Sequence, residues 1–204
     1  MRAWIYDKAI GPLTGKWYGS VLDHMGQNCH LLDVGIGTGV ALVENAGLVR
    51  AKRLCITGVD IDRDYVKRAQ LSMYKNDLVE NVDVILESVY DHQGGPYDAV
   101  YFSASFMLMP DPARALKHVS ALLKPGGRIF FTQTFQDRRS KFAERAKPLL
   151  KKLTTIEFGT VTYQEDFLAV LEDANQEVLE LSTMARKGSR SYRLAITKPR
   201  GASA

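Results

Sequence analysis

Apolar residues along this chain alternate between short continuous runs and longer stretches with a helical spacing. The continuous runs have the length of strands, whereas the stretches between them repeat apolar residues every three to four positions. Five strands are predicted in this way, at residues 31–34, 53–60, 82–87, 97–103 and 127–134. Continuously apolar strands separated by helices indicate a parallel sheet that is covered on both faces.

The last third of the chain has a different pattern. A predicted helix at residues 164–175 is followed by two strand-like runs, at residues 177–183 and 191–197. Because only about seven residues separate the two runs, they are too close for a parallel crossover and should pair antiparallel. We therefore expect an α/β fold with a doubly wound, mostly parallel seven-stranded sheet, helices on both faces and a C-terminal antiparallel β-hairpin.

Composition fits one ordinary globular domain. The chain has 204 residues, of which 46% are hydrophobic and 25% charged. It contains no apolar run long enough to span a membrane, and its N-terminus lacks the apolar region of a secretory signal. A cytoplasmic location is therefore expected. Cys29 and Cys55 are the two cysteines and fit no metal-binding spacing, so we expect no metal site.

The net charge of +4 comes mostly from one basic stretch, residues 137–152. One interpretation is a solvated amphipathic helix whose buried side carries Phe142, Ala146, Leu149 and Leu153. The other is a docking face for a phosphate-bearing substrate or an anionic membrane surface. A nucleic-acid track would use its cations, namely Arg138, Arg139, Lys141, Arg145, Lys147, Lys151 and Lys152. Charge alone does not choose between these interpretations.

A glycine-rich turn follows the first predicted strand, in the sequence "LLDVGIGTGVAL". Gly35, Gly37 and Gly39 alternate with other residues there, just after Asp33 and before a predicted helix. Glycine tolerates positive φ and allows the backbone to approach a ligand closely, and a helix N-terminus offers unpaired N–H groups. This turn therefore predicts a ligand site.

The second predicted strand ends at an acidic residue, Asp60, ~25 residues beyond the first glycine. In nucleotide-binding α/β folds, an acid at this position can accept hydrogen bonds from both hydroxyls of the ligand's ribose. The alternative is that Asp60 caps the next helix, a role that Asp62 fills more naturally. The glycine spacing is G-x-G-x-G, whereas a dinucleotide cradle needs its third glycine one position later. An NAD-dependent oxidoreductase is therefore the less favoured interpretation.

Three motifs in this order, "LLDVGIGTG", "GVDID" and "LLKPGGRIFFTQ", resemble those of the class I S-adenosylmethionine-dependent methyltransferases. The predicted hairpin is similar to the one that ends this family's sheet, and "WIYD" at residues 4–7 resembles the entry segment of its small-molecule members. The resemblance implies S-adenosylmethionine as cofactor and S-adenosylhomocysteine as product. It also implies methyl transfer to an O or N atom of a small-molecule or lipid acceptor.

The resemblance implies a cofactor site at the ends of the strands. The glycines would make room for the methionine and ribose portions, and Asp33 would reach the methionine amino group. Asp60 would bind the ribose, and Ile61 would lie against adenine. Ser88 stands where the family more often has Asp, which departs from the usual adenine contact. The complete set of expected cofactor-binding residues is Tyr6, Asp33, Gly35, Gly37, Thr38, Gly39, Asp60, Ile61, Ser88, Val89 and Ser103.

The sequence does not identify a catalytic base. An oxygen acceptor would need one, whereas an amine needs only to be neutral. The candidates near the strand ends are His92, Asp91, Tyr6 and Tyr163. A face formed by Phe102, Phe106, Met107, Leu108 and Met109 could receive the acceptor or belong to the core. The chain lacks the Asn/Asp-Pro-Pro-aromatic and Pro-Cys motifs of other methyltransferases, which favours a small-molecule or lipid acceptor.

The expected domain is residues 1–200. Within it, residues 1–28 form an N-terminal lid and helix, residues 29–135 the cofactor-binding half, and residues 136–200 the substrate-side helices and hairpin. The N-terminal cations and tryptophans could instead make a peripheral membrane contact. Two other functions are less favoured. One is an RNA- or protein-directed methyltransferase that uses residues 138–152, although nucleic acid is not a favoured partner. The other is a non-catalytic S-adenosylmethionine-binding protein. Oligomeric state is not indicated.

Overall fold

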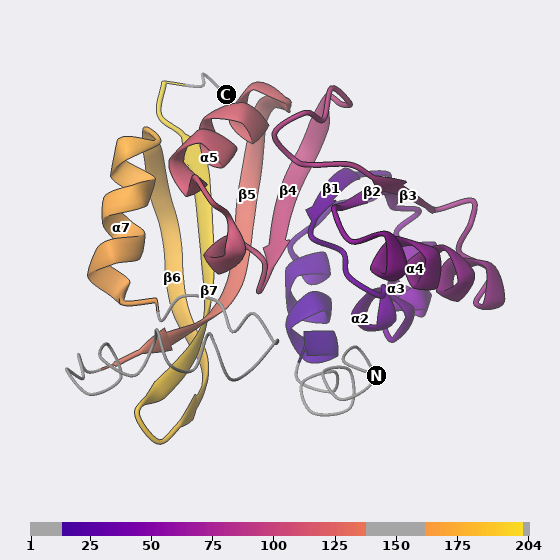
Figure 1. The fold of residues 1–204 in the computed structure, drawn as a ribbon, viewed down its shortest axis with the longest axis horizontal. Coiled ribbons are helices and arrows are strands. Elements are labelled where there is room, and N and C mark those ends of the chain that lie inside the picture. Colours follow the sequence, from indigo (N-terminus) through magenta and orange to yellow (C-terminus); the bar gives the residue numbers. More distant parts are fainter. Residues whose placement is uncertain (1–13, 138–161, 202–204) are drawn as a thin grey trace.

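A computed structural model describes residues 14–137 and 162–201 (Figure 1). Three expectations from the sequence concern residues outside these ranges. They are the cofactor contact of Tyr6, the lid formed by the first residues of the chain, and the basic stretch 138–152. All three stay predictions.

The described residues form a seven-stranded sheet with the strand order β3-β2-β1-β4-β5-β7-β6. The strands are β1 His30–Val34, β2 Cys55–Asp60, β3 Val82–Leu86, β4 Tyr97–Ser103, β5 Leu123–Gln136, β6 Gln176–Lys187 and β7 Arg190–Pro199. The first five pair in parallel, and β7 pairs antiparallel with both β5 and β6. This arrangement confirms the predicted doubly wound α/β fold with its C-terminal hairpin.

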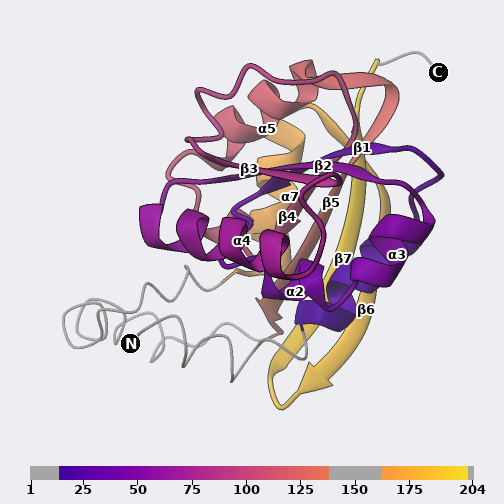
Figure 2. The ribbon, with the colours of Figure 1, turned by 90° about the vertical axis from the view of Figure 1, so that its right-hand side faces the viewer.

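Helices cover both faces of the sheet (Figures 1 and 2). One face carries the helix at residues 14–23 together with α2 Val40–Val43, α3 Ala46–Ala51 and α4 Arg63–Lys75. The other carries α5 Pro112–Ala121, α7 Gln164–Asp173 and the short 3-10 helix Phe106–Leu108. Each face has its own cluster of buried apolar side chains, so the sheet is buried on both sides, as its apolar strands predict.

Two helices begin at aspartate caps. Asp62 accepts hydrogen bonds from the amides of Asp64 and Tyr65 at the start of α4, at 2.8 and 3.1 Å. Asp111 accepts one from the Arg114 amide at the start of α5, at 3.0 Å. Because Asp62 fills the capping role, Asp60 remains available for another task.

The strands at the C-terminal side are longer than predicted. β5 begins at Leu123 instead of residue 127, because Leu123 pairs with Tyr97 across a register shift. The hairpin strands leave only Gly188 and Ser189 between them, not about seven residues. Residues 184–187 join β6 through backbone pairing with β7, and their side chains do not follow a strand pattern.

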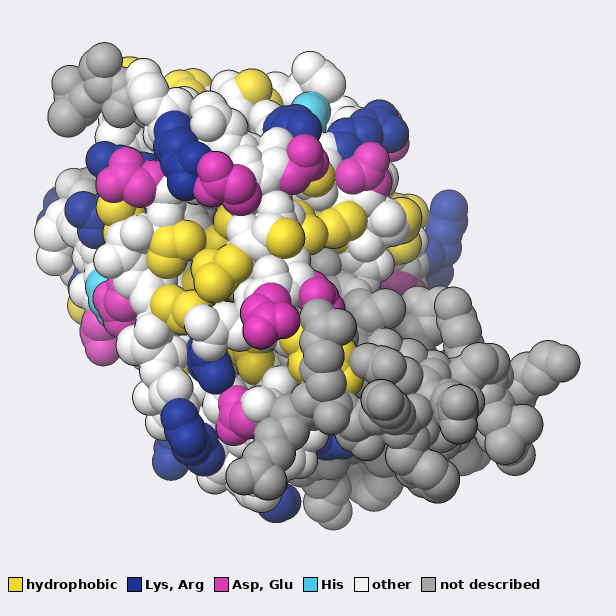
Figure 3. Space-filling view, turned by 90° about the vertical axis from the view of Figure 1, so that its left-hand side faces the viewer, with side chains coloured by type: hydrophobic (Ala, Val, Ile, Leu, Met, Phe, Trp, Pro, Cys, Tyr) yellow, Lys and Arg dark blue, Asp and Glu magenta, His cyan; other side chains and the backbone are white. Residues whose placement is uncertain are grey.

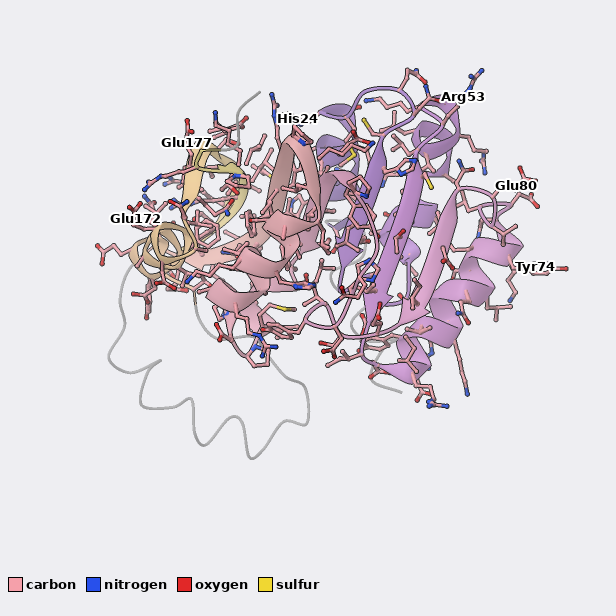
Figure 4. The ribbon with its side chains drawn as sticks, turned by 90° about the horizontal axis from the view of Figure 1, so that it is seen from above. His24, Arg53, Tyr74, Glu80, Glu172 and Glu177 are labelled. Carbon is pink, nitrogen blue, oxygen red and sulfur yellow. The ribbon has the colours of Figure 1, made fainter. Side chains whose placement is uncertain are left out.

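The two ends of the sheet are far apart in the view from above (Figure 4). Tyr74 and Glu80 lie at the end nearest β3, whereas Glu172 and Glu177 lie at the end formed by α7 and β6. Glu172 accepts two hydrogen bonds from the Arg200 guanidinium, both at 2.6 Å, and so fastens the chain beyond β7 to α7. The strand order reverses between β1 and β4, and ligands of open α/β sheets bind beyond the carboxyl ends of the strands at such a point.

Candidate cofactor-binding site

The three glycines after β1 all have positive φ, but for different reasons. A Cβ atom at Gly35 would lie 2.6 Å from the Ser105 Cβ, and one at Gly39 would lie 2.7 Å from the Met73 Cε. At Gly37, with φ of 61°, a Cβ atom would meet nothing within 4 Å. Packing against Ser105 therefore requires Gly35, whereas the atom nearest to Gly39 is the flexible end of the Met73 side chain and the middle glycine borders open space.

Asp60 holds this loop in place. Its Oδ2 accepts a hydrogen bond from the Gly37 amide, and its Oδ1 accepts one from the Asp62 amide, each at 2.9 Å. Burial raises the pKa of Asp60, and the two amide hydrogen bonds oppose that rise. Each carboxylate oxygen has a second lone pair, so this half-buried carboxylate can still accept hydrogen bonds from a ligand.

Asp33 lies at the end of β1 and is completely buried. The Tyr18 hydroxyl, on the helix at residues 14–23, donates a hydrogen bond to its Oδ2 at 2.6 Å. Its Oδ1 has no hydrogen-bond partner among the described residues. Burial raises the pKa of Asp33 to about 7, even though the Tyr18 hydrogen bond lowers it. The sequence did not predict Tyr18, because a tyrosine 15 residues upstream carries no local signal of this contact.

The loop after β4 lies against the glycine loop. The Ser105 hydroxyl donates a hydrogen bond to the Val34 carbonyl, which ties the two loops together. Ala104 has a φ of 54°, and the Oγ of neighbouring Ser103 is buried without a partner among the described residues. Ser103 is the last residue of β4, at the point where the strand order reverses, and its place near the methyl donor stays a prediction; sequence reasoning missed Ser105.

The residues expected around adenine differ in exposure. Ile61 follows Asp60 directly and is 78% exposed, which is unusual for a large apolar side chain. The Ser88 Oγ accepts a hydrogen bond from the Tyr90 amide at 3.3 Å, and Val89 is buried in the core. Thr38, in the middle of the glycine loop, is half-buried. Ile61 and Ser88 therefore offer accessible groups to a ligand, whereas Val89 offers little accessible surface and its contact with a ligand stays a prediction.

The candidate base His92 is part of a buried network. Its Nδ1 lies 2.7 Å from a Glu87 carboxylate oxygen, and its Nε2 lies 2.7 Å from the Tyr97 hydroxyl. The His118 ring donates a hydrogen bond to the His92 carbonyl at 2.8 Å. With both ring nitrogens engaged and the side chain buried, His92 fixes the loop between β3 and β4. Asp91 is exposed on that loop, and Tyr163 is buried.

The expected acceptor face is divided between core and surface. Phe102 and Phe106 are buried and pack edge to face, with ring centroids 5.2 Å apart, so both belong to the core. Leu108 is 46% exposed, and Met107 and Met109 are half-buried. Only these last three can contribute to a surface that an acceptor reaches.

A hollow of about 270 Å³ lies at the opposite edge of the sheet, near the amino ends of β1, β4 and β5. Its lining includes Asp98, whose carboxylate accepts hydrogen bonds from the His30 amide at 2.7 Å and from the Lys124 Nζ at 2.8 Å. The Asp98 charge is therefore already compensated. The unpartnered buried Asp33 Oδ1 lies instead at the edge of the sheet that carries the glycine loop.

Comparison with known proteins shows what the chain resembles. Residues 32–129, which contain the glycine loop, Asp60 and the end of β4, match the family model described as a methyltransferase domain. The ubiquinone biosynthesis O-methyltransferase of Thiobacillus denitrificans (strain ATCC 25259 / T1) is 27% identical over 182 residues, which cover 86% of this chain and 75% of that protein. Over these regions the chain is similar to S-adenosylmethionine-dependent methyltransferases.

Other curated relatives are longer than the region they share with this chain. The ubiquinone biosynthesis O-methyltransferase of Bordetella avium (strain 197N) is 32% identical over 133 residues, which cover 65% of this chain and 53% of that protein. The chain thus spans about half the length of most of the curated relatives it matches.

Solved structures share the methyltransferase fold at low sequence identity. The [4+2]-cyclase SpnF has a TM-score of 0.73 and 18% identity, with 92% of this chain and 82% of that chain covered. A geranyl diphosphate methyltransferase in complex with SAM has a TM-score of 0.71 and 14% identity, with 90% and 84% covered. Because the first of these is named a cyclase, the fold alone does not fix the reaction.

The surface near α7 carries charges of both signs. Apolar side chains lie between acidic and basic ones on that face (Figure 3), and the nearby β6 exposes Val178 and Leu179. None of the helices in the described part of the chain has the length and apolarity needed to cross a membrane.

Proposed function

We propose that this chain binds S-adenosylmethionine beyond the carboxyl ends of β1, β2 and β4 and transfers its methyl group to an oxygen or nitrogen atom of a small-molecule acceptor. The observation that carries the proposal is the open space at Gly37, beside the half-buried carboxylate of Asp60. That space would let the backbone contact a ribose whose hydroxyls donate to Asp60. The names of the curated relatives favour an oxygen acceptor.

Other residues would hold the remaining parts of the cofactor. The unpartnered Asp33 Oδ1 supplies a buried acceptor for the methionine amino group, directly or through water. The exposed Ile61 side chain offers an apolar surface for adenine, and Ser88 a polar group at its edge. Ser103 would lie near the methyl donor. Tyr6 would approach the donor from outside the described residues.

When bound, the cofactor supplies a methyl group that is already electrophilic. The chain therefore contributes mainly alignment, and holding two reactants in a near-attack geometry lowers a barrier by roughly 7–11 kcal/mol. The acceptor would approach over Met107, Leu108 and Met109, which leave partly exposed apolar surface beyond β4. The alternative acceptor is a lipid that the chain would reach through peripheral membrane contact. Comparing vesicle sedimentation of the chain with and without residues 1–12 tests for that contact.

Calorimetry with S-adenosylhomocysteine tests the site. We expect Asp60→Ala to weaken binding about 10–100-fold, equivalent to about 1.4–2.8 kcal/mol, because the ribose acceptor is lost. Asp62→Asn is the matched control, since it removes a neighbouring charge but keeps a side chain that caps α4. Unchanged affinity in folded Asp60→Ala would remove Asp60 from the site, and binding of NAD in place of the adenosyl ligands would overturn the whole assignment.

Turnover is measured with a labelled methyl donor and fractionated small-molecule extracts. Transfer of label to a fraction would identify the acceptor class and support the proposed reaction. Tight binding of both adenosyl ligands with no transfer to small molecules, lipids, RNA or protein would instead indicate a non-catalytic S-adenosylmethionine-binding protein.

A further inference from the structure

The Asp33 carboxyl group is held in an unusual way for a buried acid. One oxygen accepts a short hydrogen bond from Tyr18, at 2.6 Å, and the other has no partner among the described residues. Tyr18 is itself only 2% exposed, so water does not compensate either group. A buried polar oxygen without a partner is costly, and structures that keep one usually have a use for it.

The groups that face this carboxyl come from three elements. Tyr18 belongs to the helix at residues 14–23, and its ring packs edge to face on Tyr101 of β4, with centroids 5.0 Å apart. The Tyr101 hydroxyl is engaged with the Thr132 Oγ1 at 2.6 Å. Asp60 of β2 acts on Asp33 through like-charge repulsion. Among the described residues, nothing that faces Asp33 is a cation, so an ionised Asp33 lacks a counter-charge in the free protein.

We propose that Tyr18 is a positioning residue that keeps the Asp33 Oδ1 free for the ammonium group of the cofactor, and that Asp33 releases its proton to solvent when that group binds. This proposal rests on the proposed function and adds to it a role for Tyr18 and the release of one proton on binding. In the free protein Asp33 is a neutral acid at mildly acidic pH. In the complex it is a carboxylate paired with the ammonium, with the Tyr18 hydrogen bond still in place.

The direction of the pH dependence follows from burial. Because burial raises the pKa of Asp33 to about 7, most free molecules carry the proton at pH 6, and few carry it at pH 8.5. Affinity for S-adenosylhomocysteine should therefore rise by up to about tenfold per pH unit below pH 7 and level off above it. The Tyr18 hydrogen bond stabilises the carboxylate form of Asp33. In Tyr18→Phe, the affinity should therefore stop rising only at a higher pH than in the wild type.

Calorimetry of S-adenosylhomocysteine binding in two buffers with different heats of ionisation counts the protons released. We expect close to one proton per ligand at pH 6 and almost none at pH 8.5. 5′-Methylthioadenosine lacks the amino-acid portion of the cofactor, so its binding should release no proton from Asp33. Tyr18→Phe should bind S-adenosylhomocysteine about tenfold more weakly at pH 7, and Asp33→Asn should bind without proton release. Tyr101→Phe, the matched buried tyrosine, should keep the wild-type proton count.

The outcomes separate this inference from the proposed function. If wild-type protein binds neither adenosyl ligand, the proposed function fails. If it binds S-adenosylhomocysteine at pH 6 with no proton release, or releases the same amount with 5′-methylthioadenosine, the function stands and the inference is overturned. A Tyr18→Phe protein with wild-type affinity and pH profile would show that Tyr18 only packs. Should Tyr18→Phe not fold, loss of proton release in Asp33→Asn still decides the role of Asp33.

Discussion

Replacing Asp33 with asparagine should stabilise the free protein at pH 8 while weakening its affinity for the cofactor. Asparagine is nearly the same size and can still accept a hydrogen bond from Tyr18, but it never has to carry a buried charge. In the wild type, the folded state resists ionisation of Asp33 whereas the unfolded state does not. The substitution therefore removes a cost that the folded protein bears only above acidic pH.

The size of the effect follows from the change in pKa. The pKa of Asp33 rises from its ordinary value of 3.8 to about 7 on folding, so the folded state binds the proton more tightly. Between about pH 4 and pH 7 the unfolded chain has lost this proton and the folded chain has kept it. The wild type should thus lose stability relative to Asp33→Asn by about 1.4 kcal/mol per pH unit, up to about 4 kcal/mol, with no further change above pH 7.5.

Urea denaturation from pH 4.5 to 8.5 measures this difference, because contributions from other groups cancel when the variant is compared with the wild type. Asp98→Asn is a control of opposite sign. Burial acts to raise the pKa of Asp98, but the His30 amide and Lys124 lower it overall, so that variant should lose stability at neutral pH and approach the wild type in acid. The reasoning is refuted if Asp33→Asn is the less stable protein at pH 8 and its stability runs parallel to that of the wild type.

Two further substitutions test the loop and the histidine network. Gly37→Val should abolish S-adenosylhomocysteine binding, and it should also lower stability because valine is strained at a φ of 61°. Gly188→Val, with the same φ and the same open surroundings, should lower stability by a similar amount and leave binding unchanged. Normal binding by Gly37→Val would mean that Gly37 is only a turn residue. His92→Ala should lower the free energy of unfolding by about 2–4 kcal/mol, because the Glu87 carboxylate and the Tyr97 hydroxyl both lose their hydrogen-bond partner. A hundredfold loss of turnover in a fully stable His92→Ala protein would instead identify a catalytic base.

Local patterns predicted those parts of the fold that local forces determine. Residues 97–103 form β4 with the predicted bounds, and Asp62 caps α4 as predicted, because a continuous apolar run and an aspartate cap are both recognisable within a few positions. The early start of β5 and the full length of β6 and β7 depend on partners elsewhere in the sheet. Those partners are distant in the sequence, so the local pattern of residues does not reveal them.

The site divides in the same way. The three glycines and Asp60 lie where the motif places them, since their spacing reflects one loop between a strand and a helix. Tyr18 and Ser105 reach the same loop from distant parts of the chain and were not predicted. His92 lies in a polar segment that looks exposed, yet the fold buries it between Glu87 and Tyr97. Contacts of this kind become visible only in three dimensions.

The helix at residues 14–23 joins parts of the sheet that are separated both in sequence and in strand order. Its Trp17 ring lies 5.1 Å from the Tyr192 ring on β7, and the next residue, Tyr18, holds Asp33 on β1. Two strands, β4 and β5, lie between these anchor points. We therefore expect loosening of this helix to release β1 and β7 together, so that their amide hydrogens exchange as one cooperative unit. A ligand that protects the glycine loop should slow exchange in the C-terminal hairpin as well, although no hairpin residue is expected to touch it.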